Sequence, residues 1–547
     1  MRRRATRLAG GVTLVTALAV ALSGCVASER DPEGSGGDAK TTFVFAASAD
    51  PGSLDPAFAS DGESFRVARQ IFEGLVGVEP GTADPAPLLA ESWDISEDGL
   101  EYTFHLKEGV TFHDDTPFDA EAVCFNFDRW ASWTGLAASE SLSYYYTHVF
   151  GGQGENGKYE SCAASDAATA VVTLRSPLPE LVPALSLPSF SIQSPTALEE
   201  FGADEIGGAE DAPELSEYAM GHPVGTGPYT FESWNTGESI NLSAYDDYWG
   251  EFGDVQEIVF TVIAEPTARR QALEAGDIDG YDLVAPADVD ALATAGYQIL
   301  DREPFNILYL GMNQAQAPLD DPLVRQAIAH AIDKEALVQA ALPEGTEVAT
   351  QFVPSIVSGY SEDVATYEYD QDLARELLAE AGQENLELEF NYPTDVSRPY
   401  MPDAAAIYEA ISADLEEVGI TVTATPEPWS PTYLDTIQGS ANHGLHLLGW
   451  TGDYNDTYNF IGTFFGAESS EWGFNDPDLF QSLSDARYAP VADQEALYQA
   501  ANEAVMDFLP GVPLASPVPS LAFTEQVQGY PVSPVQDEVY NVITFTE

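Results

Sequence analysis

The sequence predicts an α/β fold, because segments with the period of a β-strand alternate with helical segments along most of its 547 residues. Two helical segments end at a glycine, Gly382 or Gly419, and a strand-like run follows each of them, over residues 386–391 and 420–425. With 44% hydrophobic residues, the chain is also long enough to form two or more domains with a core.

The strands are predicted from alternating polarity or from short apolar runs between polar turns. In residues 102–106, for example, the polar Thr103 and His105 alternate with apolar residues. Strands are predicted over residues 42–47, 102–106, 170–174, 258–263, 307–310, 386–391, 420–425 and 445–450.

The helices are predicted from apolar residues spaced three and four positions apart. This spacing occurs over residues 65–76, 119–130, 267–275, 323–342, 372–381 and 403–418. Because Gly382 and Gly419 follow the last two segments, we expect them to end these helices.

The amino end has the layout of a secretory signal peptide. Four arginines within the first seven residues precede a 15-residue apolar run, Leu8–Leu22, and the run leads into Ser23-Gly24-Cys25. This layout resembles bacterial lipoprotein precursors, which implies cleavage after residue 24 and a Cys25 thiol that carries diacylglycerol, with palmitate as an acyl chain. We expect anchoring to the cell membrane on its extracytoplasmic face, with residues 25–41 as a flexible linker. An uncleaved anchor helix with an incidental cysteine is the alternative.

The chain is strongly acidic. Residues 1–24 contain four arginines and no acid, so 16 of the 20 cations and all 90 carboxylates remain after cleavage, a formal charge of −74. Such a chain repels nucleic acid and anionic lipid, so neither is an expected partner. The acid excess is expected at the solvated surface, and a saline habitat is one hypothesis for it.

Two cysteines remain besides Cys25. In an oxidising compartment disulfides persist, so we predict a bridge between Cys124 and Cys162. It would contribute about 3 to 4 kcal/mol in the chain-entropy model. Unpaired thiols are the alternative, and two cysteines without nearby histidines make a poor zinc site.

The common catalytic signatures are absent. The sequence contains no HExxH, P-loop or GxSxG motif. His443 and His446 are three residues apart, but they border a predicted buried strand, so packing is favoured over metal binding. We therefore expect no enzyme activity, no metal and no cofactor, with a hydrolase that uses paired carboxylates as the alternative.

Six motifs occur in an order that resembles the family 5 extracellular solute-binding proteins of ABC importers, over nearly all of residues 42–547. They are Gly52-Ser-Leu-Asp-Pro56, Ile71-Phe-Glu-Gly-Leu75, Tyr102-Thr-Phe-His-Leu-Lys-Glu-Gly-Val110, Pro223-Val-Gly-Thr-Gly-Pro-Tyr229, Tyr245-Asp-Asp-Tyr-Trp-Gly250 and Pro318-Leu-Asp-Asp-Pro-Leu-Val-Arg-Gln-Ala-Ile328. The segments at 397–402 and 449–460 resemble the dipeptide- and oligopeptide-binding lipoproteins of that family most closely.

The resemblance implies a two-lobe periplasmic-binding-protein-like fold of type II, cluster C. Lobe one would comprise residues 42–304 and 515–547 with an extra subdomain, and lobe two residues 305–514. The chain would cross between the lobes near Phe305 and Leu514, and the ligand would bind in the cleft between them.

The resemblance also implies a binding site for a zwitterionic peptide. Asp453 would meet the ligand ammonium and Arg398 its carboxylate, which matches the need of a buried charge for an opposite, hydrogen-bonded partner. Further contacts are expected from Trp450, Tyr400, Thr451, Gly449, Ser60 and Gly62. The alternatives are a turn carboxylate at Asp453, an ion pair at Arg398 and a core position for Trp450.

The predicted function is capture of di- or oligopeptides by a lipid-anchored, monomeric protein that delivers them to ABC permease subunits. Other ligands taken by the family, namely nickel complexes, haem or oligosaccharides, are alternatives, and so is a lipoprotein that senses peptides. The segment between Cys124 and Cys162, with Tyr144-Tyr145-Tyr146, departs from the dipeptide binders. If it lines the cleft, the specificity need not be for dipeptides.

Overall fold

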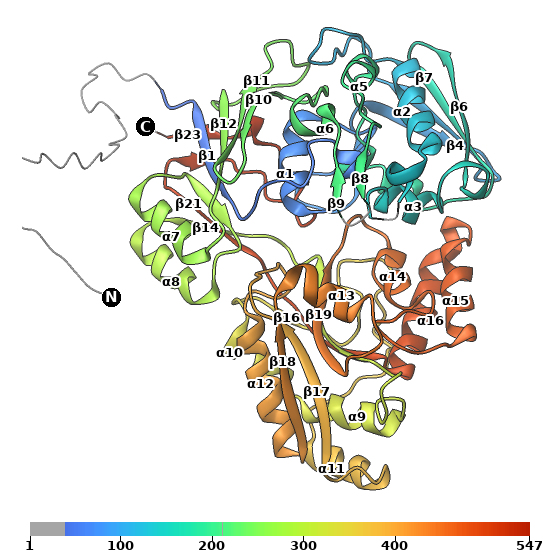
Figure 1. The fold of residues 1–547 in the computed structure, drawn as a ribbon, viewed down its shortest axis with the longest axis vertical. Coiled ribbons are helices and arrows are strands. Elements are labelled where there is room, and N and C mark those ends of the chain that lie inside the picture. Colours follow the sequence, from blue (N-terminus) through green and yellow to red (C-terminus); the bar gives the residue numbers. More distant parts are fainter. Residues whose placement is uncertain (1–38, 140, 210–211, 547) are drawn as a thin grey trace, which may run out of the picture. The chain divides into compact units, whose positions relative to one another are not determined.

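The computed structural model describes residues 39–139, 141–209 and 212–546. The predicted signal peptide, Cys25 and most of the linker therefore lie outside the described residues. The chain divides into two units, Met1–Ala39 and Lys40–Glu547, and the elements below belong to the second (Figure 1).

A seven-stranded mixed sheet, here called the first sheet, has the order β10-β11-β12-β1-β13-β21-β14. Its strands are β1 (Thr42–Ala47), β10 (Tyr229–Asn235), β11 (Ser239–Ala244), β12 (Glu257–Val262), β13 (Gly280–Asp282), β14 (Gln298–Asp301) and β21 (Ser520–Phe523). β1 pairs in parallel with β12, so that Phe43 lies opposite Ile258 and Phe45 opposite Phe260. These side chains are fully buried and form its core.

A six-stranded sheet, the second sheet, has the order β16-β20-β15-β19-β17-β18. Its strands are β15 (Asn306–Met312), β16 (Glu347–Val348), β17 (Leu386–Pro393), β18 (Ile420–Glu427), β19 (Leu445–Thr451) and β20 (Gly511–Ser516). Every residue of β15 is buried, which explains its continuous apolar run. β17 pairs in parallel with both β18 and β19, so the carboxyl ends of these three strands lie at one edge.

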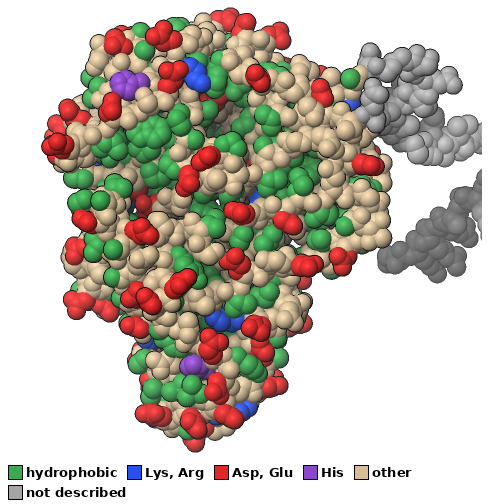
Figure 2. All heavy atoms as spheres, turned by 180° about the vertical axis from the view of Figure 1, so that it is seen from behind, with side chains coloured by type: hydrophobic (Ala, Val, Ile, Leu, Met, Phe, Trp, Pro, Cys, Tyr) green, Lys and Arg blue, Asp and Glu red, His purple; other side chains and the backbone are tan. Residues whose placement is uncertain are grey.

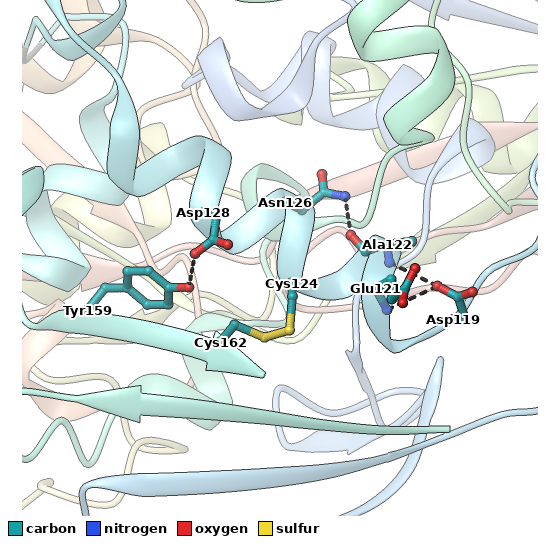
Figure 3. Close-up of a disulfide and its surroundings, with 8 residues drawn as sticks. All are labelled: Asp119, Glu121, Ala122, Cys124, Asn126, Asp128, Tyr159 and Cys162. Atoms are coloured by element: carbon teal, nitrogen blue, oxygen red, sulfur yellow. Dashed lines mark hydrogen bonds between the residues drawn. A yellow bond between two sulfur atoms is a disulfide. The ribbon is translucent and has the colours of Figure 1, made fainter. Parts of the chain in front are cut away.

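A four-stranded antiparallel sheet forms a third layer with its own core. Its order is β4 (Ala90–Ile95), β5 (Glu101–Leu106), β7 (Thr169–Leu174) and β6 (Tyr159–Asp166), and α2 (Ala120–Ser132) packs on it. The predicted disulfide is confirmed: Cys124 of α2 is bonded to Cys162 of β6, with 5.1 Å between their Cα atoms (Figure 3). It is flanked by the Tyr159 hydroxyl, which donates to Asp128 at 2.5 Å.

The remaining elements connect or cover these sheets. The helices are α1 (Gly62–Ile71), α3 (Tyr144–Phe150), α4 (Leu181–Ala184), α5 (Pro195–Glu200), α6 (Glu217–Gly221), α7 (Pro266–Ala275), α8 (Pro286–Ala295), α9 (Pro322–Ala331), α10 (Lys334–Ala341), α11 (Gln371–Glu380), α12 (Ala404–Glu417), α13 (Leu434–Ile437), α14 (Ile461–Phe465), α15 (Pro477–Arg487) and α16 (Val491–Phe508). The short strands are β2 (Val76–Val78), β3 (Pro85–Pro87), β8 (Gly207–Ala209), β9 (Ala212–Glu214), β22 (Val527–Gln528) and β23 (Thr544–Phe545). Single helical turns are η1 (Pro56–Phe58), η2 (Gly135–Ala138), η3 (Gly154–Asn156), η4 (Pro188–Phe190), η5 (Trp429–Tyr433), η6 (Thr457–Asn459) and η7 (Tyr540–Val542).

The helix predicted over residues 65–76 is too long, because α1 ends at Ile71. The backbone of Glu73 forms a bridge with Ile192 instead of continuing the helix. Gly74 then lies so close to the backbone that an added Cβ would stand 2.9 Å from the carbonyl oxygen of Leu185. These long-range contacts override the local apolar spacing.

The helix predicted over residues 323–342 is two helices, α9 and α10. Ile332 is extended between them, and the Asp333 side chain accepts a hydrogen bond from the Ala336 amide at 2.9 Å. Asp333 therefore begins a new helix as its cap. The other predicted strands and helices are confirmed with ends shifted by at most about two residues.

The predicted lobe boundaries remain a proposal. The first and third sheets use residues before 302 together with β21, and the second sheet uses residues 306–516. In the part of the chain that the structure describes, no helix has the length and apolar character needed to cross a membrane.

Candidate ligand-binding site

A cavity of about 170 Å³ lies between two segments that are distant in the sequence. One wall is α3, and the other begins at the end of β19 and extends through η6 and α14 to α15 (Figure 1). The lining residues are Tyr144, Tyr145, His148, Val149, Trp450, Asp453, Tyr454, Tyr458, Asn459, Gly462, Thr463 and Arg487. Counting His148, half of these residues have aromatic rings, and charged groups are few.

Asp453 is the one carboxylate among the described residues that line this cavity. Its Oδ1 accepts a hydrogen bond from the Tyr145 hydroxyl at 2.8 Å, and its Oδ2 accepts one from the Asn459 amide at 3.0 Å. Burial raises the pKa of Asp453 to about 6, although both hydrogen bonds and the charge of Arg69 act in the opposite direction. A carboxylate whose charged form is this costly gains strongly from an added cation.

Asn459 fixes the start of the loop that carries Asp453. Its side-chain oxygen accepts hydrogen bonds from the Asp453 amide at 2.9 Å and from the Trp450 indole at 3.2 Å. The Trp450 ring also packs edge-on against Phe464 of α14, with 6.0 Å between ring centres. Trp450 is thus held by a hydrogen bond at one end while its ring lines the cavity.

Arg398 lies in a tight turn after β17. The Arg398 amide donates to the Met401 carbonyl oxygen at 3.0 Å, and the Met401 amide donates back at 2.9 Å. The guanidinium stacks on Trp429, 4.5 Å from the ring centre, and its buried Nε has no hydrogen-bond partner.

This lack of partners sets Arg398 apart from the other arginines. Eleven arginines lie within the described residues, and in ten of them the guanidinium donates a hydrogen bond to a carboxylate, a carbonyl or an amide oxygen. Within that part of the chain, Arg398 alone keeps its guanidinium without a hydrogen bond or ion pair.

Gly449 and Tyr400 bring the Arg398 turn onto the end of β19. A Cβ atom added to Gly449 would lie 2.3 Å from Tyr400 Cδ2 and 2.4 Å from the Ile307 carbonyl oxygen. Only glycine therefore permits this close approach. The ring of Tyr400 is buried, and burial raises the pKa of its hydroxyl to about 12.

The remaining predicted residues do not line the cavity. Thr451 ends β19 opposite Asn306, and its buried Oγ1 has no hydrogen-bond partner. Ser60 and Gly62 are exposed on either side of Asp61, the cap of α1. The cavity thus brings together Asp453 and Trp450, while Arg398, Tyr400, Gly449, Thr451, Ser60 and Gly62 lie outside its wall.

Sequence reasoning missed most of the aromatic wall. Tyr144, Tyr145, His148 and Val149 belong to α3, within the segment between the two bridged cysteines. The tyrosine run in that segment was the available signal. Arg487 gave no signal, because it meets the cavity only through the packing of α15.

A second cavity of about 150 Å³ lies beside Glu73. Burial raises the pKa of Glu73 to about 7. Its carboxylate nevertheless accepts hydrogen bonds from Thr226 at 2.8 Å, Tyr248 at 3.0 Å and Trp249 at 2.9 Å. With three donors already in place, Glu73 is best explained as a structural group.

No group of three or more His, Cys, Asp and Glu side chains in the described residues is arranged to hold a metal ion. His443 and His446 are buried with their ring centres 5.0 Å apart, and His446 Nε2 lies 3.3 Å from Glu471 Oε1. Burial and the neighbouring His446 lower the pKa of His443 to about 4. Both rings are packed in the core beside β19.

Three comparisons relate this geometry to known proteins. A family model described as "Bacterial extracellular solute-binding proteins, family 5 Middle" matches residues 84–472. Heme-binding protein A of Haemophilus influenzae is 29% identical over 99% of this chain and 99% of its own. The dipeptide-binding protein of Escherichia coli is 29% identical over 90% of this chain and 92% of its own.

A solved structure extends the likeness to three dimensions. The ABC transporter-associated periplasmic binding protein DppA from Helicobacter pylori, in complex with the peptide STSA, superposes with a TM-score of 0.78 at 28% identity. The match covers 92% of this chain and 98% of that protein. The predicted α/β fold of the periplasmic-binding-protein class is therefore confirmed.

Proposed function

Because the chain belongs to the bacterial extracellular solute-binding proteins of family 5, we propose that it captures di- or oligopeptides outside the cytoplasm for an ABC importer. Members of this family bind solutes for transport and carry out no bond chemistry, so the chain is a binding protein and not an enzyme. The resemblance inferred from the six sequence motifs is thereby confirmed.

The observation that carries the peptide proposal is the presence of two oppositely charged residues, Asp453 and Arg398, at one edge of the second sheet. Both residues follow the carboxyl ends of adjacent parallel strands, β19 and β17, which is where open α/β sheets commonly bind ligands. One is a partly buried carboxylate on a cavity wall, and the other is an arginine without an ion pair among the described residues. A zwitterion supplies the opposite charge to each.

The chemistry of both ends favours this assignment. An ammonium has three donors for the oxygens of Asp453, and a planar guanidinium can hold a carboxylate through two parallel hydrogen bonds. Trp450 and Tyr400 would supply flat apolar surface along the peptide. Thr451, Gly449, Ser60 and Gly62 complete the proposed contact set.

The proposal extends to the whole molecule. Residues 42–304 and 515–547 would form one lobe and residues 305–514 the other, and ligand that contacts both would favour a closed form. The closed monomer would dock on the permease while a lipid on Cys25 holds it to the membrane. Peptide sensing without import is the alternative use of the same binding event.

Haem is a second candidate ligand, because a relative that matches this chain over its full length is named a heme-binding protein. Nickel complexes and oligosaccharides remain further alternatives. A carboxylate and an arginine without an ion pair, both at one edge of the second sheet, favour a small zwitterion over these ligands. A direct measurement can separate them.

Titration calorimetry of the purified protein tests the proposal. The ligands are Ala-Phe, N-acetyl-Ala-Phe, a pentapeptide, haemin and an oligosaccharide. We expect tight binding of free peptide and a large loss on acetylation, because the acetylated ligand has no ammonium for Asp453. Binding of haemin or sugar alone would move the specificity elsewhere and leave the family assignment intact.

A further inference from the structure

The helix α3 supplies four of the residues that line the cavity around Asp453: Tyr144, Tyr145, His148 and Val149. It lies within the segment bounded by Cys124 and Cys162, and the disulfide closes this segment at both ends. Since the carboxylate and this wall share one cavity, whatever binds Asp453 must also fit against α3.

Tyr145 has a specific relation to the carboxylate. Its hydroxyl donates to Asp453 Oδ1 at 2.8 Å across a sequence separation of 308 residues. Its ring is buried and packs against Phe65, with 5.6 Å between ring centres, so the hydroxyl is held in place. Burial and the charge of Asp453 raise the pKa of the Tyr145 hydroxyl, which therefore stays protonated and remains a donor.

The carboxylate keeps room for a ligand. Two carboxylate oxygens offer about four acceptor positions. Tyr145 and Asn459 fill one each, so the remaining positions can accept from an ammonium. The polar and charged groups around Asp453 include Tyr145 and His148 of α3, Arg69 of α1, Arg487 of α15, Tyr454, and Tyr458 and Asn459 of η6.

His148 closes the exposed end of the same wall. Its Nδ1 donates to the Tyr144 carbonyl oxygen at 2.8 Å, and its ring centre lies 4.0 Å from that of Tyr144. The imidazole is thus fixed at the cavity although the residue is exposed. Because His148 and Asp453 line the same cavity, the imidazole occupies part of the space that a ligand at Asp453 would share.

We propose that α3 selects the amino-terminal residue of the bound peptide, with Tyr145 as a positioning residue for Asp453 and His148 as a limit on the first side chain. This inference rests on the proposed function and names the part of the ligand that α3 recognises. Without the Tyr145 hydroxyl, the partly buried carboxylate of Asp453 loses a donor that favours its charged form. More of the carboxylate is then protonated near neutral pH and its Oδ1 is no longer held in place, so a free ammonium binds more weakly, whereas a blocked amino end is affected less.

Calorimetry on the full chain with Ala-Phe, N-acetyl-Ala-Phe and Trp-Phe tests the proposal. Tyr145→Phe should weaken the binding of Ala-Phe about tenfold. It should lower the ratio of the affinities for the free and the acetylated peptide by a similar factor. Tyr146→Phe is the matched control, because the Tyr146 hydroxyl is buried on the same helix without a hydrogen-bond partner. This control should leave the preference unchanged.

His148→Ala gives a second test at an exposed position, where truncation spares the core. It should raise the affinity for Trp-Phe relative to that for Ala-Phe about fivefold, as expected for a widened pocket. The inference would be overturned if Tyr145→Phe and Tyr146→Phe had the same ratio of affinities for free and acetylated peptide. It would also be overturned if His148→Ala left the ratio of the affinities for Trp-Phe and Ala-Phe unchanged. Failure of the unaltered protein to bind any peptide would instead overturn the proposed function.

Discussion

At the scale of single residues, the scarcity of cations makes the position of Arg398 informative. Most guanidinium groups in the described chain are held by carboxylates or carbonyls, as in Arg302, which donates to Glu538 and Asp282 in the core. Arg398 instead rests on the Trp429 ring and keeps its donors for another group. Cation–π stacking fixes the plane of a guanidinium without using its hydrogen bonds.

Arg398→Ala should weaken dipeptide binding by about 2 to 5 kcal/mol, because the ligand carboxylate would be left buried without a partner. Arg398→Lys should recover only part of this loss, since an ammonium cannot form the two parallel hydrogen bonds. Calorimetry gives both values. Arg375→Ala is the control, as Arg375 pairs with the exposed Asp372 on α11. Unchanged affinity in Arg398→Ala would remove this residue from the site.

The raised pKa of Asp453 predicts a pH-dependent affinity. Burial shifts this pKa upward to about 6, so the carboxylate takes up a proton as the pH falls through that value. Dipeptide affinity should be full between about pH 6.5 and 7.5, where the ligand amine is still charged, and should fall up to tenfold per pH unit below about 6.

The binding constant as a function of pH checks this expectation. Asp453→Asn should bind free dipeptide weakly at every pH, and its affinity should no longer fall below about pH 6. His148→Gln is the matched control, because it replaces the imidazole on the same cavity wall and should leave the pH dependence in place. If the affinity of Asp453→Asn still fell below about pH 6, the titration would belong to another group.

At the scale of elements, hydrophobic periodicity predicted the limits of segments that do not depend on distant contacts. The strand β1 has the predicted limits, Thr42–Ala47. Asp453 and Trp450 could be predicted because residues 449–460 resemble the corresponding segment of the dipeptide binders. The end of β19 and the loop after it then bring both residues to the cavity without help from a distant segment.

Elements whose role depends on distant partners could not be predicted in this way. α1 ends at Ile71 because the backbone beyond it pairs with Ile192. α3 lies on the cavity because Tyr145 meets a residue 308 positions away. Apolar spacing contains no information about such pairings. The sequence therefore indicates the α3 segment only through its departure from the dipeptide binders.

The disulfide should stabilise the element that carries the cavity wall. It closes a loop across 38 residues, and cross-linking a loop of that length contributes about 3 to 4 kcal/mol by restricting the unfolded chain. The double variant Cys124→Ser/Cys162→Ser should therefore lose about that much unfolding free energy in urea, with weaker dipeptide binding because α3 is less firmly placed. Reductant should reproduce the loss in the unaltered protein and have no effect on the variant. Equal stability of both proteins would argue against this role.

At the scale of the whole molecule, charge is distributed unevenly between surface and interior. The sequence has 90 acidic and 20 basic residues, and acidic side chains are spread over the face seen in Figure 2, with few basic ones between them. Several of the basic residues are buried instead, as with Arg302, Arg129 and Arg269. The surface repels other polyanions, while the arginines join distant parts of the chain.

One such junction spans the two proposed lobes beside the cavity. Arg487 of α15 donates to Glu180 Oε1 at 2.6 Å and to the His148 carbonyl oxygen at 3.2 Å. Lys158 donates to the Tyr488 hydroxyl at 2.8 Å. Glu180 is only 2% exposed, and Arg487 is its ion-pair partner. We call these four side chains, Glu180, Arg487, Lys158 and Tyr488, the clamp.

The clamp joins the two walls of the cavity, and Glu180 itself does not line the cavity. We therefore expect the clamp to affect the affinity for every ligand alike. Glu180→Gln removes the charge that pairs with Arg487 and should weaken Ala-Phe and N-acetyl-Ala-Phe by the same factor, about tenfold, mainly through faster dissociation. Stopped-flow binding to both peptides measures this. Asp372→Asn, in an exposed ion pair with Arg375, should change neither rate. If Glu180→Gln instead altered the preference between the two peptides, the clamp would belong to the ligand contacts and not to closure of the lobes.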